Sequence, residues 1–293
     1  MILRDIRQEY QVRAKDGEGK EAFLAIESFN LDVRPGEFVS IVGPSGCGKS
    51  TLLDILAGLA RATSGSYLID GKEVTGPALD RGIVMQGYAL FPWRTVRKNV
   101  EFGLEMKGVA SAERGEISRR FIDLVNLQGF EDRYPHELSG GMKQRVAIAR
   151  ALAYDPEILL MDEPFAAVDA QTRETLQDEL MRIWDQTKKT IIFVTHSIDE
   201  AILLADRVVV MSTNPGRVKS VVRIVLPRPR TNQDMRASSD FAAVRQTVWE
   251  TLQEDGGEAP PAPEGEEPFG PLRHRPPFAG QLAVADSRLA AGS

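Results

Sequence analysis

The segment Gly43-Pro-Ser-Gly-Cys-Gly-Lys-Ser-Thr51 constrains the fold more than any other part of the sequence, because it fits the spacing G-x-x-x-x-G-K-[ST]. The apolar run Glu37–Val42 precedes it, and a helix is predicted to begin near Lys49 and to run into Leu52–Leu59. Glycines let a backbone curl so that successive N–H groups face one point, and a helix N-terminus adds the positive end of its dipole. The segment therefore predicts a strand–loop–helix unit whose loop binds phosphate.

The chemistry of this loop assigns roles to its side chains. Lys49 is expected to reach the β- and γ-phosphates of a nucleotide, and the hydroxyl of Ser50 is expected to be a Mg²⁺ ligand. The pattern alone permits kinases, GTPases and many ATPases, but a GTPase would need a guanine-reading element such as Asn-Lys-x-Asp, which this sequence lacks. The predicted nucleotide contacts of the loop are Gly43, Pro44, Ser45, Gly46, Cys47, Gly48, Lys49, Ser50 and Thr51.

The order of apolar segments predicts an α/β fold. Strands alternate with helices in the second half of the chain, which is the pattern of parallel βαβ units. From about residue 95 to residue 152 apolar residues recur at helical spacing with no strong strand signal. Residues 1–33 are typical of short strands joined by a hairpin loop at 14–21, and 66–74 of a second hairpin. The remaining predicted strands are Gly82–Gln86, Glu157–Asp162, Thr190–Thr195 and Arg207–Ser212, with helices at Met142–Ala153, Gln171–Gln186, Ser197–Leu204 and Phe241–Glu254.

Composition changes sharply near the C-terminus. Residues 255–293 contain seven prolines, six glycines and six acidic residues against three arginines. Such a segment cannot bury enough apolar surface to offset the entropy of ordering it. We therefore predict one nucleotide-binding domain over residues 1–254, with an inserted helical subdomain at about 87–153, and a disordered, proline-rich acidic tail over 255–293.

The overall balance of residues excludes several classes of protein. The net charge is −6, which argues against a nucleic-acid partner. The single cysteine, Cys47, excludes an internal disulfide and suits a reducing compartment. The sequence contains no apolar run of the roughly 18 residues that a membrane-spanning helix needs, and its first residues lack the apolar core of a signal peptide.

Two adjacent carboxylates follow an apolar strand in Ile158-Leu-Leu-Met-Asp-Glu-Pro164. The carboxyl ends of strands are where open α/β sheets bind ligands. Asp162 is expected to hold Mg²⁺, directly or through water, and Glu163 to polarise an attacking water. Asp169 is a candidate N-cap of the following helix as well as a candidate site residue, and the two roles are compatible.

A third anion-binding element is predicted at Leu138-Ser-Gly-Gly-Met-Lys-Gln-Arg145, just before a helix. Free N–H groups, a helix dipole and glycines without side chains would form an anion site there. Taken alone, a Ser-Gly-Gly sequence could equally be a simple helix cap.

These elements, in this order, resemble the nucleotide-binding subunits of the ABC transporter family, and Leu138–Gln144 resembles that family's signature. The resemblance covers about residues 4–254. It implies a phosphate-loop (RecA-like) ATPase core with an N-terminal antiparallel β subdomain and the inserted α-helical subdomain, with ATP and Mg²⁺ as cofactors. It also implies a head-to-tail homodimer, or a pair with a similar ATPase, in which the signature of one subunit closes on the γ-phosphate held by the other.

Site residues carry over from the family position by position. Tyr10 matches the aromatic residue that stacks on adenine, with Phe23 as its rival. Gln86 matches the glutamine that ligates Mg²⁺ and senses the γ-phosphate, and His196 matches the switch histidine. His196 precedes Ser197-Ile-Asp-Glu200, a capping-box pattern that predicts the start of a helix. The remaining matches are Ser139, Gly140 and Gly141 as contacts to phosphate in the partner subunit, Asp162 as the Mg²⁺-associated acid, and Glu163 as the catalytic base.

One segment departs from the family pattern. After the base, the family usually has Gly or Ser followed by Ala-Leu-Asp. This chain has Ala166-Ala-Val-Asp169. The aspartate is retained, so communication between the two sites of a dimer is expected. Ala166 and Val168 leave the detailed geometry of that segment open.

The type of transporter is inferred from what surrounds the core motifs. The aromatic loop Tyr88-Ala-Leu-Phe-Pro-Trp93 predicts a partner surface, and in the family it contacts the permease; packing of the loop under the helical subdomain is the alternative. The absence of a predicted membrane span favours an importer, with separate permease subunits and a solute-binding protein, at the cytoplasmic face of the inner membrane. Segments such as Phe91-Pro-Trp93 and Leu226-Pro-Arg-Pro-Arg-Thr231 resemble the nitrate/sulfonate/taurine importer group.

The sequence also bears on other cargoes and on two other classes of protein. The cargo could be another small solute, such as bicarbonate or a pyrimidine precursor, because the ATPase never touches it. A soluble ABC ATPase outside transport would need a long coiled coil or a second cassette, which this sequence lacks. A metabolic kinase would need an acceptor pocket and would have no use for Leu138–Gly141.

Overall fold

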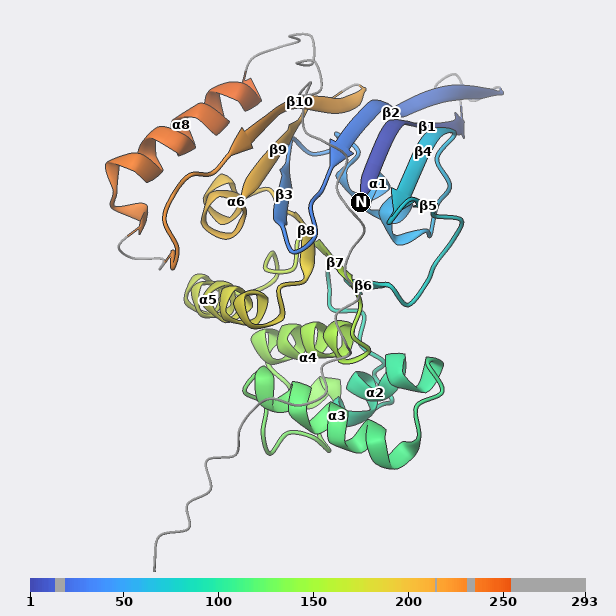
Figure 1. The fold of residues 1–293 in the computed structure, drawn as a ribbon, viewed down its shortest axis with the longest axis vertical. Helices are drawn as coiled ribbons and strands as arrows, with labels where there is room; N and C mark the ends of the chain where they lie inside the picture. The colour runs from blue at the N-terminus through green and yellow to red at the C-terminus, as the bar shows by residue number, and fades with distance from the viewer. Residues whose placement is uncertain (14–18, 214, 231–234, 254–293) are drawn as a thin grey trace, which may run out of the picture.

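The computed structural model describes residues 1–13, 19–213, 215–230 and 235–253 (Figure 1). The predicted tail at 255–293 lies outside the described residues. A ten-stranded mixed sheet runs in the order β5-β4-β1-β2-β10-β9-β3-β8-β7-β6. The strands are β1 Ile2–Arg13, β2 Lys20–Asp32, β3 Phe38–Val42, β4 Ser64–Ile69, β5 Lys72–Glu73, β6 Arg81–Val84, β7 Ile158–Asp162, β8 Thr190–Val194, β9 Arg207–Met211 and β10 Gly216–Arg223.

The sheet has an antiparallel part and a parallel part. Strands β1, β2, β4 and β5 pair antiparallel and form the predicted N-terminal β subdomain. Strands β9, β3, β8, β7 and β6 pair parallel and form the α/β core. The two parts are joined by β10, which pairs parallel with β2 and antiparallel with β9. Sequence analysis did not predict β10, whose burial pattern is mixed rather than apolar.

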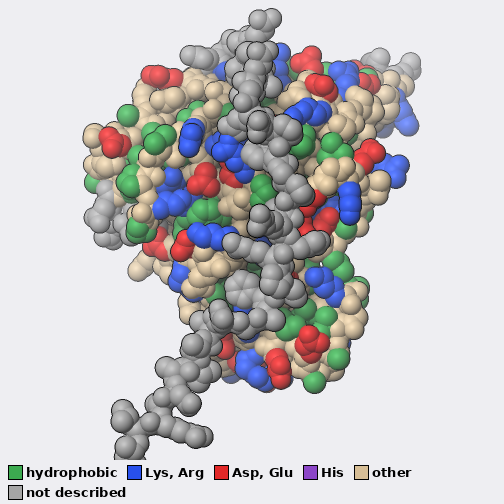
Figure 2. Space-filling model, in the orientation of Figure 1, with side chains coloured by type: hydrophobic (Ala, Val, Ile, Leu, Met, Phe, Trp, Pro, Cys, Tyr) green, Lys and Arg blue, Asp and Glu red, His purple; other side chains and the backbone are tan. Residues whose placement is uncertain are grey.

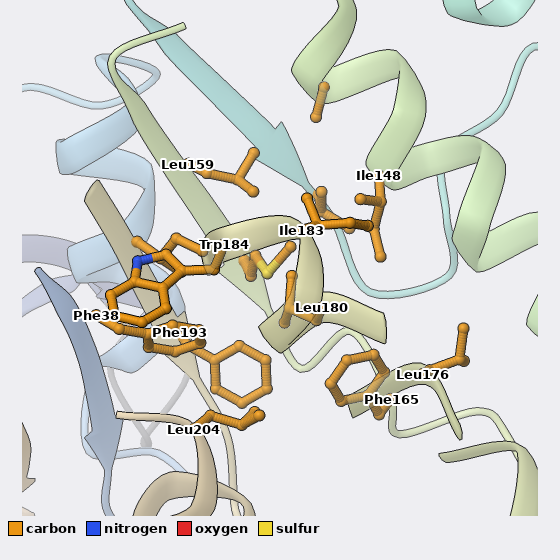
Figure 3. Close-up of a cluster of buried hydrophobic side chains, with 14 of the residues drawn as sticks. Phe38, Ile148, Leu159, Phe165, Leu176, Leu180, Ile183, Trp184, Phe193 and Leu204 are labelled. Atoms are coloured by element: carbon orange, nitrogen blue, oxygen red, sulfur yellow. The ribbon is translucent and has the colours of Figure 1, made fainter. Parts of the chain in front are cut away.

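The helices cover both faces of the parallel strands, as alternating side chains require. On β3, Phe38 and Val42 point into one buried cluster, whereas Val39 and Ile41 point into a second cluster with α1. Figure 3 shows the first cluster, where Phe38 and Phe193 of the sheet meet Trp184 of α5. The helices are α1 Lys49–Ala57, α2 Val96–Met106, α3 Ser111–Leu124, α4 Gly140–Ala153, α5 Ala170–Thr187, α6 Ile198–Leu204 and α8 Ser239–Gln253, with a short 3₁₀ turn at Pro135–Glu137.

The inserted helices α2, α3 and α4 pack on one another at the lower end of the molecule in Figure 1. Val100 of α2, Ile122 of α3 and Ile148 of α4 belong to the same buried cluster as the sheet residues. The helical region is therefore a branch of the main core and continuous with it.

Side-chain caps begin four of these helices, which explains where they start. Thr95 is the N-cap of α2, and its hydroxyl accepts a hydrogen bond from the backbone N–H of Lys98 at 3.3 Å. Ser139, Asp169 and Ser197 cap α4, α5 and α6 in the same way.

Three of the predicted boundaries that involve candidate site residues need correction. Strand β6 ends at Val84, so Gln86 follows the strand by two residues instead of ending it. Helix α4 begins at Gly140, two residues before its predicted start, because the cap Ser139 lies inside the signature segment. Strand β8 ends at Val194, which leaves Thr195 outside the strand, next to His196.

Candidate nucleotide-binding site

The parallel strands bring the predicted site residues to one edge of the sheet. Neighbouring parallel strands share a direction, so the residues that follow β6, β7, β8 and β3 all lie at the carboxyl edge. Gln86 follows β6, Asp162 ends β7, His196 follows β8 and Gly43 follows β3. Residues more than 150 positions apart in the chain thus meet along one line.

The phosphate loop, residues 43–51, turns directly into α1. Gly48 is the N-cap residue of α1 and adopts φ +92°, in the left-handed region that favours glycine. A Cβ atom at Gly48 would lie 3.1 Å from the carbonyl oxygen of Ala25 in β2, so the loop is also packed closely against the neighbouring strand. The backbone curl predicted from the glycines is present.

Lys49 is buried within this loop. Its side chain is 5% exposed, and its Nζ donates to the carbonyl oxygens of Gly43 at 2.8 Å and Pro44 at 3.0 Å. These two hydrogen bonds hold the end of the Lys49 side chain inside the loop. Together with the N-terminus of α1, it forms a site that fits a phosphate group.

Asp162 provides a second indication that a charged ligand belongs here. Burial raises the pKa of its carboxyl, and the neighbouring carboxylates of Glu163 and Asp54 raise it further. The hydroxyl of Ser50 hydrogen-bonds the same carboxyl and favours its charged form. Its Oδ1 is buried without a hydrogen-bond partner in the described part of the chain. An orphaned acidic oxygen beside a hydroxyl offers oxygen ligands of the kind that a divalent cation such as Mg²⁺ takes. Among the described residues, no group of three or more His, Cys, Asp or Glu side chains could hold a metal ion without further ligands.

Glu163 and His196 are in direct contact. Nε2 of His196 lies 2.5 Å from Oε1 of Glu163, and the two side chains are 49% and 14% exposed. Glu163 adopts φ +43°, a backbone conformation that is strained for a residue with a side chain. Its backbone N–H donates to the carbonyl of Val194 at 2.9 Å, which anchors the residue to β8. The pair faces the open carboxyl edge, where a ligand could reach both groups.

Tyr10 and its rival Phe23 are neighbours. They lie directly opposite each other in the β1–β2 pairing and are 37% and 45% exposed. Opposite residues of an antiparallel pair project from the same face. Phe23 lies two residues before Ala25, which is about 7 Å along the strand. Ala25 is the residue whose carbonyl oxygen lies close to Gly48 of the phosphate loop. The structure therefore places two partly exposed aromatic rings side by side and leaves the choice between them open.

The signature residues Ser139, Gly140 and Gly141 form the cap and first residues of α4. The exposed hydroxyl of Ser139 accepts from the N–H of Met142 at 3.3 Å. The atoms nearest to a Cβ built on Gly140 belong to Tyr88, Ala167 and Val168. At Gly141 the nearest atom belongs to Thr172, so neither glycine contacts the phosphate loop of its own chain.

Asp169 caps α5, where its Oδ1 accepts from the N–H of Thr172 at 2.9 Å. This hydrogen bond lowers the pKa of its carboxyl. The capping role is thus present, and the side chain is also exposed beside the signature.

Three residues that sequence analysis gave no site role organise this edge: Thr195, Arg173 and Glu200. Glu200 was expected to close a capping box on the N–H of Ser197, but that N–H donates instead to the hydroxyl of Thr195 at 3.0 Å. The hydroxyl of Thr195 in turn donates to Glu200 at 2.5 Å. One signal for this group was present in the sequence, Glu200 in the capping-box pattern Ser197-Ile-Asp-Glu200. That pattern indicates a helix cap and gives no reason to expect a contact with Thr195 or Arg173.

The aromatic loop after Gln86 is partly packed against α2 and partly exposed. Phe91 packs on Phe102 with a ring-centroid distance of 4.7 Å. Trp93 stays 72% exposed, next to Phe91. The buried amide of Asn99 holds the loop by hydrogen bonds to Phe91, Arg94 and Thr95.

Charge on the visible surface is mixed. On the face shown in Figure 2, basic and acidic side chains of the described residues are interspersed with small apolar groups. Such interspersion is typical of a solvent-exposed surface without a strong field of one sign. None of the helices in the described parts of the chain is long and apolar enough to cross a membrane.

Comparison with known proteins identifies the family of this chain. Residues 26–166 match the ABC transporter family. The chain is 58% identical over 231 residues to an uncharacterized ABC transporter ATP-binding protein of Methanocaldococcus jannaschii, covering 79% of this chain and 85% of that protein. It is 51% identical over 204 residues to a nitrate import ATP-binding protein of Synechocystis, covering 70% and 77%. It is 46% identical over 231 residues to an aliphatic sulfonates import ATP-binding protein of Bacillus cereus, covering 79% and 89%.

Solved structures show the same fold. A dimeric bacterial ABC transporter cassette aligns with a TM-score of 0.67 and 34% identity, covering 76% of this chain and 98% of the cassette. A post-hydrolysis cassette dimer bound to ADP and phosphate aligns with a TM-score of 0.66 and 33% identity, over the same shares.

The chain therefore belongs to the ABC transporter family, and it is an ATP-binding, ATP-hydrolysing cassette. The predicted family and fold class are confirmed. The phosphate loop falls inside the family match, and so do Asp162 and Glu163.

Proposed function

We propose that this chain is the ATPase subunit of an ABC importer and that Glu163 is its catalytic base. The contact between Glu163 and His196 at the carboxyl edge carries the proposal. A carboxylate held in a strained conformation beside an imidazole is suited to take a proton from an attacking water, while the imidazole meets the γ-phosphate. Lys49 and the loop N–H groups bind the phosphates, and Tyr10 stacks on adenine.

Magnesium completes the proposed site. Ser50, Gln86 and Asp162 would hold Mg²⁺, supported by the orphaned Oδ1 of Asp162 and its hydrogen bond to Ser50. The ion would neutralise charge on the phosphates. Gln86 is exposed after β6, and its position beside β7 is compatible with this role.

We further propose that two copies, or this chain and a similar ATPase, act together. Ser139, Gly140 and Gly141 begin a helix but contact no phosphate loop in their own chain, which supports a phosphate contact in a partner subunit. Asp169 lies beside them and would connect the two sites. The dimeric cassette that this chain resembles supports the same arrangement.

The proposed partners outside the dimer are permease subunits and a solute-binding protein that acts through them. The 72% exposed Trp93 supports a permease contact from the cytoplasmic face of the inner membrane. Relatives named for nitrate and aliphatic sulfonate import support a small anionic cargo such as nitrate, taurine or a sulfonate. Uptake measured in a deletion strain offered these anions and bicarbonate tests the cargo.

The variant Glu163→Gln tests the proposed base. Because its phosphate contacts are unchanged, we expect ATP binding near the wild-type level, turnover lowered by at least about 100-fold, and an ATP-dependent dimer in gel filtration. Glu179→Gln, a buried acid between α4 and α5, is the control and should hydrolyse ATP normally. Near-normal hydrolysis by Glu163→Gln would show that the base is another group.

Mixing two inactive chains tests the dimer. A Lys49→Ala chain lacks a phosphate ligand, and a Ser139→Arg chain blocks the signature. If the signature acts on the partner's nucleotide, the heterodimer retains at most one competent site, and each variant alone is inactive. Wild-type activity in either variant alone contradicts the arrangement.

A further inference from the structure

Glu200 is a buried acid that the proposed chemistry does not use. Its side chain is 8% exposed, and burial raises the pKa of its carboxyl. It accepts hydrogen bonds from Gln177 at 3.2 Å and from the hydroxyl of Thr195 at 2.5 Å, and Nε of Arg173 lies 3.7 Å away. A buried carboxylate is costly unless such partners hold it, so its location beside the site calls for a physical role.

On one side, Glu200 shapes the turn that carries His196. A hydroxyl donates one hydrogen bond and can accept others. The hydroxyl of Thr195 donates to Glu200 and accepts from the N–H of Ser197 at 3.0 Å. The backbone N–H of Thr195 also donates to Ile41 of β3. The residues on both sides of His196 are therefore pinned, and Glu200 sets the direction of the Thr195 hydroxyl.

On the other side, Arg173 holds the segment that follows Glu163. Its guanidinium donates to the carbonyl of Phe165 at 3.2 Å and to that of Val168 at 3.1 Å. These carbonyls lie on both sides of Ala166 and Ala167, and the segment Phe165–Val168 contains both residues that depart from the family pattern, Ala166 and Val168. The planar fork of an arginine can reach two carbonyls and a carboxylate at once, which a lysine cannot do.

We propose that Arg173 and Glu200 are positioning residues that hold Glu163 and His196 in contact. Arg173 contacts the segment that follows Glu163, and Glu200 contacts Thr195, which precedes His196. The contact between Arg173 and Glu200 therefore links the residues that follow β7 to those that follow β8. The inference rests on the proposed roles of Glu163 and His196. It explains how a strained Glu163 and a half-exposed His196 keep a 2.5 Å contact.

The physical effect is preorganisation. A half-exposed imidazole otherwise samples several rotamers. Each misplacement lowers the rate, because Glu163 must already point at the attacking water and His196 at the γ-phosphate. Neither Arg173 nor Glu200 would touch the nucleotide. Their loss should therefore lower kcat for ATP hydrolysis and leave KM for ATP nearly unchanged.

The matched experiment compares Glu200→Gln with Glu179→Gln in the full chain. Glu179 lies in α5 and Glu200 in α6, and each side chain is 8% exposed and within 4.0 Å of an arginine side chain. Burial raises the pKa of both carboxyl groups. Loss of one charge-assisted contact predicts that kcat falls about tenfold in Glu200→Gln and by less than about twofold in Glu179→Gln. Urea unfolding of both variants checks that they are equally folded.

Five further variants separate the effect of charge from that of geometry. Arg173→Lys keeps the charge but loses the fork, so it should lose activity as Arg173→Met does. Thr195→Ser should keep the wild-type kcat, whereas the isosteric Thr195→Val should not. In the double variant Arg173→Met/Glu200→Gln the loss should not exceed the larger single loss, because both changes break one connection.

A direct readout is the nitrogen NMR spectrum of the His196 imidazole. The chain has three histidines, so His196→Gln assigns the signal. We expect the signal to move in Glu200→Gln and Arg173→Met but not in Glu179→Gln. An unmoved signal, a kcat equal to that of Glu179→Gln, or losses that multiply in the double variant would each overturn the proposal.

The two proposals can fail separately. If Glu163→Gln still hydrolyses ATP while Glu200→Gln moves the His196 signal, the positioning role stands and Glu163 is not the base. If Glu163→Gln is inactive while Glu200→Gln behaves like Glu179→Gln, the positioning role is wrong and the base stands.

Discussion

Replacing Asn99 with alanine should destabilise the protein through one buried amide. Asn99 is 0% exposed and makes four hydrogen bonds: from the N–H of Phe91 at 2.9 Å, and to the carbonyls of Phe91, Arg94 and Thr95 at 3.0–3.2 Å. The amide thus ties α2 to the loop that exposes Trp93.

The magnitude follows from the fate of these partners. Each hydrogen bond contributes about 1 kcal/mol net, and the four backbone partners are only part-buried, so water replaces some of the loss and about 2–3 kcal/mol remains. Alanine is the better helix former by a few tenths of a kcal/mol, which offsets little of this. With an m-value of about 3 kcal/mol/M, the urea midpoint should fall by about 0.7–1 M.

The assay is urea unfolding of the Asn99→Ala variant, with trypsin cleavage at Arg94 as a local readout. Arg97→Ala is the control, because its ion pair with Asp132 lies on the same helix but is solvent-exposed and contributes less than about 1 kcal/mol. We expect faster cleavage and a lower midpoint in Asn99→Ala only. A midpoint no lower than that of Arg97→Ala would refute the reasoning.

Two further predictions concern packing and pH. Gly103→Ala should lower stability by about 1–3 kcal/mol, because a Cβ there would lie 2.1 Å from the ring of Tyr154; Gly115→Ala, in open space on α3, should raise it by about 0.5–1 kcal/mol, and differential scanning calorimetry measures both. Burial raises the pKa of Tyr154 to about 12 from 10.0, so its stabilising contribution is complete below pH 10 and is lost as the pH rises toward 12. Urea midpoints of wild type and Tyr154→Phe across this range should converge at high pH; a constant difference would contradict the assignment.

Local motifs allowed most of the candidate site to be predicted. The phosphate loop, the acids after β7 and the signature are each continuous in sequence, and each owes its chemistry to a strand end or a helix start. For the same reason the caps Ser139, Asp169 and Ser197 were recognisable, since a cap involves residues only three positions apart.

Contacts between distant segments could not be predicted in this way. The strand β10 was missed because its residues alternate poorly, and only its pairing with β2 and β9 defines it. Tyr10 and Phe23 were rivals in the sequence, and the strand register made them neighbours.

The sequence by itself determined which groups this protein has for nucleotide chemistry, because short motifs specify their own backbone conformations. Only the tertiary structure decided how those groups are held. Glu200 belongs to a capping pattern in the sequence, but its carboxylate joins Thr195 and Arg173. A buried carboxylate takes the strongest partners within reach, and the packing of α5 against α6 determines which partners those are.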